Sequence, residues 1–145
     1  MIKKKIWLRY LIGGIFSLTI FNINISCSQE EKDCSMKSEF IYLNNSDFKL
    51  ETPIGIILPQ SNLSKKYDFL GSCHAIPTDY LPPFRDVLTI KVDETKCKTY
   101  NSSSLTEGEG PLVISNYISE KIDENNFKFI YTFSNEDFQN VEDCN

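Results

Sequence analysis

The chain has 145 residues, which is enough for one domain of ordinary size. Its hydrophobic fraction of 41% and aromatic fraction of 12% are typical of a folded protein and exclude disorder over most of its length. Residues 27–145 hold 11 basic and 20 acidic side chains, and a surface that acidic excludes binding to nucleic-acid phosphates.

The first 26 residues have the order of a secretory signal peptide. They start with four basic residues, Lys3, Lys4, Lys5 and Arg9. The apolar run Tyr10–Phe21 follows and is shorter than the roughly 20 apolar residues that a membrane-spanning helix needs. The polar residues Asn22 and Asn24 come after it. We therefore expect residues 1–26 to be removed on export; the alternative is an uncleaved anchor over Ile6–Ile25.

Ile25-Ser26-Cys27 resembles the lipobox of small bacterial lipoproteins, in the relaxed form of Bacteroidota or spirochaete lipoproteins. Asn24 stands where that motif usually has an apolar residue, and the following acidic residues are similar to the tract of surface-exposed lipoproteins. The resemblance implies that Cys27 carries lipid, palmitate among its acyl chains, and anchors the protein to the bacterial outer membrane or cell surface. A competing cleavage before Gln29 predicts a soluble secreted or periplasmic protein.

The count of five cysteines agrees with export, because Cys27 is either lipidated or removed. Four candidates for disulfides remain in an oxidising compartment: Cys34, Cys73, Cys97 and Cys144. We favour the pairs Cys34–Cys144 and Cys73–Cys97, which would connect the two ends of the domain; Cys34–Cys73 with Cys97–Cys144 is the main rival. The wide spacing of the cysteines and the single histidine do not fit a zinc site, so no metal and no cofactor is expected.

Residues 27–38 are expected to form the lipidated cysteine and an acidic tether, and residues 39–145 a single globular domain. The domain opens with the apolar run Phe40–Leu43, a turn cluster over Asn44–Asp47 and renewed alternation at Phe48 and Leu50, which together suggest a hairpin. Ile54–Leu58, between two prolines, is a buried or edge strand.

The clearest strands lie in the second half of the chain. Val87–Val92 alternates, with its apolar residues on one face. Leu112–Ile122 is expected to be a strand with one apolar face of period two, made by Leu112, Ile114, Ile118 and Ile122. A four-residue loop over Asp123–Asn126 leads to an aromatic strand whose buried face consists of Phe127, Phe129, Tyr131 and Phe133.

Two short helices complete the expected fold. One begins at Ser61 or Asn62, runs through Leu70 and ends at Gly71. The other follows the capping-box pattern Ser134–Asp137 and would return the C-terminal cysteine to the body of the domain. The sequence therefore predicts an α+β domain, mainly antiparallel β with one or two short helices and two disulfides.

The best candidate for a binding site lies in the proline-rich segment Ser72–Arg85. Its interaction residues would be Tyr80, Leu81, Phe84 and Arg85, since aromatic residues and arginine are enriched where proteins bind partners. The competing interpretation is a loop that folds its aromatic side chains onto the core.

No motif indicates catalysis. Cys73 and His74 are neighbours in sequence, whereas a nucleophile and its base normally come from distant positions, and no second histidine exists. We therefore expect a non-enzymatic binding role at the cell envelope, with the membrane as one partner through the lipid and another envelope or extracellular protein as a second. The alternative is an inhibitor or immunity-like factor against an exported enzyme, and an envelope hydrolase is least favoured.

Overall fold

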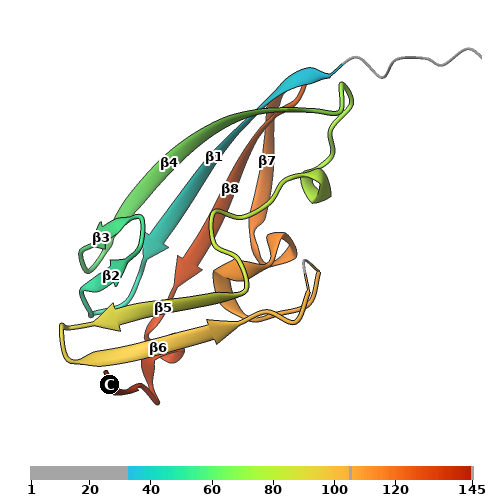
Figure 1. Cartoon of the computed structure of the whole chain (residues 1–145). Helices are drawn as coiled ribbons and strands as arrows, with labels where there is room; N and C mark the ends of the chain where they lie inside the picture. Colours follow the sequence, from blue (N-terminus) through green and yellow to red (C-terminus); the bar gives the residue numbers. More distant parts are fainter. Residues whose placement is uncertain (1–32, 105, 145) are drawn as a thin grey trace, which may run out of the picture. The chain divides into compact units, whose positions relative to one another are not determined.

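The computed structural model describes residues 33–104 and 106–144 (Figure 1). The proposed signal peptide 1–26, the proposed lipidation residue Cys27 and the tether residues 28–32 lie outside the described residues. The first strand begins at Cys34, whereas the sequence placed the start of the domain at residue 39. Residues 34–38 therefore belong to a sheet.

The fold contains two β-sheets. A four-stranded sheet has the order β4-β1-β8-β7 and is made by β1 (Cys34–Asn44), β4 (Ser61–Gly71), β7 (Ile118–Asp123) and β8 (Asn126–Phe133). A five-stranded sheet has the order β3-β2-β5-β6-β9 and is made by β2 (Leu50–Thr52), β3 (Gly55–Ile57), β5 (Val87–Val92), β6 (Lys96–Asn101) and β9 (Glu142–Asp143). β1 and β8 are parallel, and the other neighbouring strands are antiparallel.

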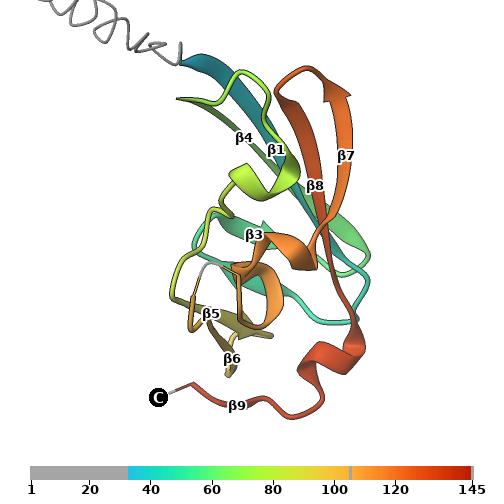
Figure 2. The same cartoon turned by 90° about the vertical axis from the view of Figure 1, so that its right-hand side faces the viewer.

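The described residues contain no α-helix, which corrects the expected α+β class to a mainly β fold with one mixed and one antiparallel sheet. The helical segments are single 3₁₀ turns: η1 (Pro77–Asp79), η2 (Gly110–Leu112), η3 (Ile114–Asn116) and η4 (Asn135–Phe138). The yellow-green connection from η1 to β5 and the orange turns η2 and η3 lie on the inner side of the four-stranded sheet (Figure 2).

One core joins the two sheets. Alternate residues of β1 are buried, and β8 adds its aromatic face beside them, as the sequence predicted. Strands β5 and β6 run across the ends of β1 and β8 (Figure 1). The predicted alternation of β5 is confirmed, because Leu88, Ile90 and Val92 are at most 1% exposed.

The helix predicted for residues 61–70 is wrong, because this segment is strand β4. It pairs with β1 over its whole length, from Cys34 opposite Gly71 to Asn44 opposite Ser61. Leu63 and Tyr67 then share the inner face, while Leu70 points outward and is 72% exposed. Backbone pairing along a long neighbour has outweighed a spacing that also suits a helix.

The hairpin predicted around residues 44–47 is also wrong, because β1 and β2 belong to different sheets. Asn44 is fully buried, and its Nδ2 donates to the carbonyl oxygens of Phe48, Ile57 and Leu58 at 2.8, 3.2 and 3.1 Å. The Asn44 Oδ1 accepts from the Ser46 backbone N–H at 3.0 Å. This network directs the chain from one sheet to the other.

The long strand predicted over residues 112–122 is only half correct. Leu112 and Ile114 are buried in the turns η2 and η3, and β7 begins at Ile118. Ile118 and Ile122 are 67% and 54% exposed, so the four residues do not share a face. The turn between β7 and β8 is tighter than the predicted four residues, since Asp123 already pairs with Asn126.

The predicted C-terminal helix is a single 3₁₀ turn. The Ser134 N–H donates to the Asp137 Oδ2 at 2.8 Å, so the capping box is present. An extended segment then returns the chain to β6, where the Cys144 N–H donates to the Thr95 carbonyl at 3.0 Å.

Both disulfides are present, but the favoured pairing is wrong and the rival pairing is found: Cys34–Cys73 and Cys97–Cys144. Strand register explains this result. Cys34 stands opposite Gly71, two residues before Cys73, and Cys97 stands opposite Glu142, two residues before Cys144.

Candidate functional site

Tyr80 fixes the proline-rich segment to the four-stranded sheet. Its side chain is fully buried, and its ring centroid lies 5.5 Å from that of Phe69, 5.3 Å from Phe127 and 5.2 Å from Phe129. Burial and, to a smaller extent, the negative charges of neighbouring carboxylates raise the pKa of the Tyr80 hydroxyl. Tyr80 is therefore part of the core, as the competing interpretation of this segment expected.

Phe84 fixes the same segment a second time, four residues later. It is 6% exposed, and its ring centroid lies 5.5 Å from that of Tyr42. Between these anchors Leu81 is 42% exposed, and Arg85 beyond them is exposed as well. The structure thus divides the four predicted interaction residues into two anchors and two surface residues.

The start of the segment is fixed too. The Ala75 N–H donates to the Asn125 Oδ1 at 2.9 Å, which attaches it to the turn between β7 and β8. The Ile76 N–H donates to the Asp79 Oδ2 at 2.9 Å and caps η1. Because the disulfide of Cys73 holds the preceding residues, the segment is constrained along its whole path.

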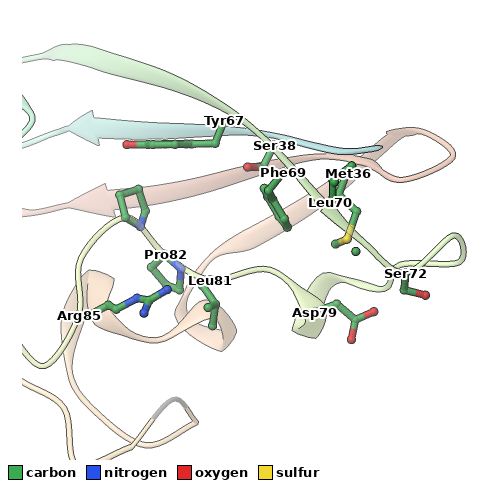
Figure 3. Close-up of a pocket in the computed structure, with 12 residues that line it drawn as sticks. Met36, Ser38, Tyr67, Phe69, Leu70, Ser72, Asp79, Leu81, Pro82 and Arg85 are labelled. Atoms are coloured by element: carbon green, nitrogen blue, oxygen red, sulfur yellow. The ribbon is translucent and has the colours of Figure 1, made fainter. Parts of the chain in front are cut away.

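A cavity of about 680 Å³ lies between this segment and the four-stranded sheet; we call it the β4 groove. Figure 3 shows side chains from both sides converging on it. Its lining residues are Met36, Ser38, Tyr67, Phe69, Leu70, Gly71, Ser72, Asp79, Leu81, Pro82, Pro83 and Arg85. Its volume is in the range of small-ligand sites.

The floor of the groove comes from strand pairing. Phe69 stands opposite Met36 and Tyr67 opposite Ser38, so the four side chains lie on one face of the sheet. Tyr67 and Phe69 are each 37% exposed, which is high for aromatic residues on the inner face of a sheet. Sequence reasoning missed these residues because it assigned them to a helix; alternation through Leu63, Tyr67 and Phe69 was the available signal.

The polar groups of the groove are few. Among the described residues, the Ser38 Oγ is buried without a hydrogen-bond partner and lies beside the groove. Burial raises the pKa of Tyr67, so its hydroxyl stays protonated near neutral pH. An otherwise apolar floor with hydroxyl groups favours a ligand that is largely apolar.

The two charged side chains of the lining lie at opposite ends of the groove (Figure 3). The Asp79 carboxylate is engaged in capping η1. Within the described ranges, Arg85 forms no ion pair. An unpaired guanidinium at one end of the groove favours an anionic group on the ligand.

Two other hollows adjoin these elements. One of about 150 Å³ lies on the other side of the proline-rich segment and shares Leu81, Pro82 and Arg85 with the β4 groove. The other, of about 550 Å³, is lined mostly by charged residues such as Lys37, Lys66 and Lys128. Neither brings two partly exposed aromatic rings together with an arginine, as the β4 groove does with Tyr67, Phe69 and Arg85, so the β4 groove is the better candidate.

The structure answers the question of a cysteine nucleophile. Cys73 is bonded to Cys34, and His74 is exposed beside it. In the described part of the chain, no three His, Cys, Asp or Glu side chains gather as a metal site would require. Nor do residues 33–104 and 106–144 include a helix of the length and apolar character needed to cross a membrane.

The chain matches no protein-family model, no curated protein and no solved structure.

Proposed function

We propose that this protein is an exported, lipid-anchored binding protein of the bacterial envelope, without catalytic activity, and that its ligand binds in the β4 groove. The ligand would be elongated, with an apolar body against Tyr67 and Phe69 and an anionic group at Arg85. The observation that carries this proposal is the meeting of half-exposed aromatic rings and an unpaired arginine in one cavity. Such concave, mostly apolar sites with a few polar groups are typical of ligand binding.

Fractionation of cells that express the full chain tests the anchor. The wild type should be in the membrane fraction, and its intact mass should show loss of residues 1–26 and addition of lipid at Cys27. Cys27→Ala should release the protein, because the acyl chains supply the membrane affinity. Retention of Cys27→Ala in the membrane at the wild-type level would refute the lipid anchor.

A fluorescence titration with anilinonaphthalene sulfonate tests the groove, because this probe joins an aromatic body to an anionic group. We expect Leu81→Asp to weaken binding about tenfold or more, since a charge would enter the apolar wall. Arg85→Ala should weaken it by a smaller factor, through loss of the sulfonate contact. Ile118→Asp, the same kind of change at another exposed apolar residue, on β7, is the matched control and should bind like the wild type. Equal affinity of Leu81→Asp and Ile118→Asp would contradict the site.

A further inference from the structure

We propose that β4 pairs edge to edge with β4 of a second copy of this chain, so that two four-stranded sheets become one. β4 is an outer strand of its sheet and has eleven residues, yet only β1 pairs with it. The first part of β4 lies near β3, since Gly55 approaches the Leu63 side chain. Figure 1 shows no strand along the outer side of the second half of β4, the side away from β1. This inference rests on the edge of the sheet and not on the ligand of the β4 groove.

Charges on the outer face of the sheet already alternate from strand to strand. Along one row, Glu120 of β7 stands opposite Lys128 of β8, Lys128 opposite Glu39 of β1, and Glu39 opposite Lys66 of β4. The first pair is an ion pair of 3.3 Å between the Lys128 Nζ and the Glu120 Oε2. The row ends at the edge with a lysine, so an acidic residue is the complementary neighbour.

The next row ends with the opposite charge. Lys37 of β1 stands opposite Asp68 of β4, which is exposed at the edge of the sheet. An antiparallel pair of two β4 strands centred on Tyr67 sets Lys66 opposite Asp68 of the second copy, and symmetry repeats the pair. Both rows then continue across the new junction with alternating charge.

The same charges select this register over its neighbours. Moving the centre of the pairing from Tyr67 to Lys66 or to Asp68 keeps every side chain on its own face of the sheet. The first shift sets Lys66 opposite Lys66 of the second copy, and the second sets Asp68 opposite Asp68. Like charges directly opposite one another destabilise a strand pair. On the inner face, the preferred register sets Tyr67 opposite Tyr67 and Lys65 opposite Phe69, so no like charges face each other there. A partner of the same sequence is therefore the occupant that this edge fits.

Sedimentation equilibrium of the purified full chain, as the cell produces it, tests the proposal with charge exchange. The wild type should show a monomer–dimer equilibrium. Lys66→Glu and Asp68→Lys should each weaken the dimer about tenfold or more, because two attractive pairs become repulsive in each dimer. The double variant Lys66→Glu/Asp68→Lys should return close to wild-type affinity, since its charges are exchanged rather than removed.

Lys121→Glu on β7 is the matched control, because it changes the net charge by the same amount as Lys66→Glu at the other edge. Its dimer affinity should equal that of the wild type. A wild type that sediments as a monomer at every concentration would overturn the proposal, and so would a double variant no tighter than the single ones. Recovery in the double variant also shows that the single variants did not fail merely by unfolding.

Discussion

Strands β4 and β7 form the two edges of one sheet, but they differ in length, regularity and surroundings. β7 has six residues, all exposed, and its pairing with β8 shifts register between Lys121 and Asp123. β4 has eleven residues and pairs with β1 without interruption. Short, irregular and charged edges resist pairing with other chains, whereas a long regular edge is available for it.

The aromatic residues at these edges show the same difference. Tyr117, directly before β7, is 7% exposed, and its hydroxyl donates to the Pro111 carbonyl at 2.8 Å. Tyr67 of β4 is 37% exposed and lines the β4 groove. The β7 side thus contributes its aromatic residue to stability, and the β4 side keeps one at the surface. A binding surface needs partly exposed side chains of this kind, which supports the binding role proposed for β4.

Alkaline pH should have the largest effect and should distinguish the buried Tyr117 from the partly exposed Tyr67. Burial raises the pKa of Tyr117 and of Tyr42 far above the ordinary value of about 10. Their contribution to stability is complete below a pH of about 10, where these hydroxyls are protonated in both the folded and the unfolded chain. It is lost as the pH rises toward their pKa in the folded protein, because these hydroxyls then ionise in the unfolded chain but not in the folded one. We therefore expect the domain to unfold at strongly alkaline pH, which near-ultraviolet circular dichroism measures.

Phenolate absorbance provides the contrast in that titration. Burial also raises the pKa of Tyr67, but this side chain is partly exposed and should ionise before the domain unfolds. Tyr67→Phe should remove the early step and leave the later cooperative step unchanged. If every tyrosine ionised together near pH 10 (about the unperturbed value) with the fold intact, the burial described for Tyr117 and Tyr42 would be contradicted.

Removing the Tyr80 ring should have the next largest effect, because this ring supports the wall of the β4 groove. We expect Tyr80→Ala to lower the free energy of unfolding by about 3–5 kcal/mol in a urea titration. Ile118→Ala on β7 should change it by no more than about 0.5 kcal/mol, because that side chain is exposed.

Tyr80→Phe separates packing from hydrogen bonding at the same position. Among the described residues the buried Tyr80 hydroxyl has no hydrogen-bond partner, so its removal should leave stability equal or slightly higher. A loss from Tyr80→Phe as large as that from Tyr80→Ala would mean that the hydroxyl, and not the ring, fixes the segment.

Opening the Cys34–Cys73 disulfide beside β4 should have a somewhat smaller effect on stability. Its effect on amide hydrogen exchange should be local. Replacing Cys34 and Cys73 together by serine should lower the free energy of unfolding by about 2–4 kcal/mol. Amide exchange should rise at the end of β4 and over residues 72–76, because the bond connects them to the start of β1. Replacing Cys97 and Cys144 should instead raise exchange around β6 and β9. Identical exchange patterns in the two double variants would contradict these local roles.

Sequence reasoning succeeded where a residue pattern fitted only one structure. Alternation identified β5 and β8, and the parity of the cysteines led to two disulfides. It failed where both a helix and a strand fitted the same residues. The spacing of Leu63, Tyr67 and Leu70 suits a helix, but pairing with β1 makes the segment a strand. The disulfide pairing depended on strand register, which the spacing of cysteines does not contain.

The candidate site was half predictable for the same reason. The composition of the proline-rich segment pointed to Tyr80, Leu81, Phe84 and Arg85, but only the folded chain shows which of them are anchors and which face solvent. The opposite wall, Tyr67 and Phe69, lay in a segment whose secondary structure was assigned wrongly. Because a groove belongs to two segments, it can be found only when both are placed.

The binding role of the β4 groove is tested most directly by the backbone amide chemical shifts of the isotope-labelled full chain, recorded during titration with anilinonaphthalene sulfonate. The largest changes should fall on residues 67–71 of β4 and on residues 79–85 of the opposite wall. Largest changes on β7, or on the five-stranded sheet, would place the ligand elsewhere and contradict the account.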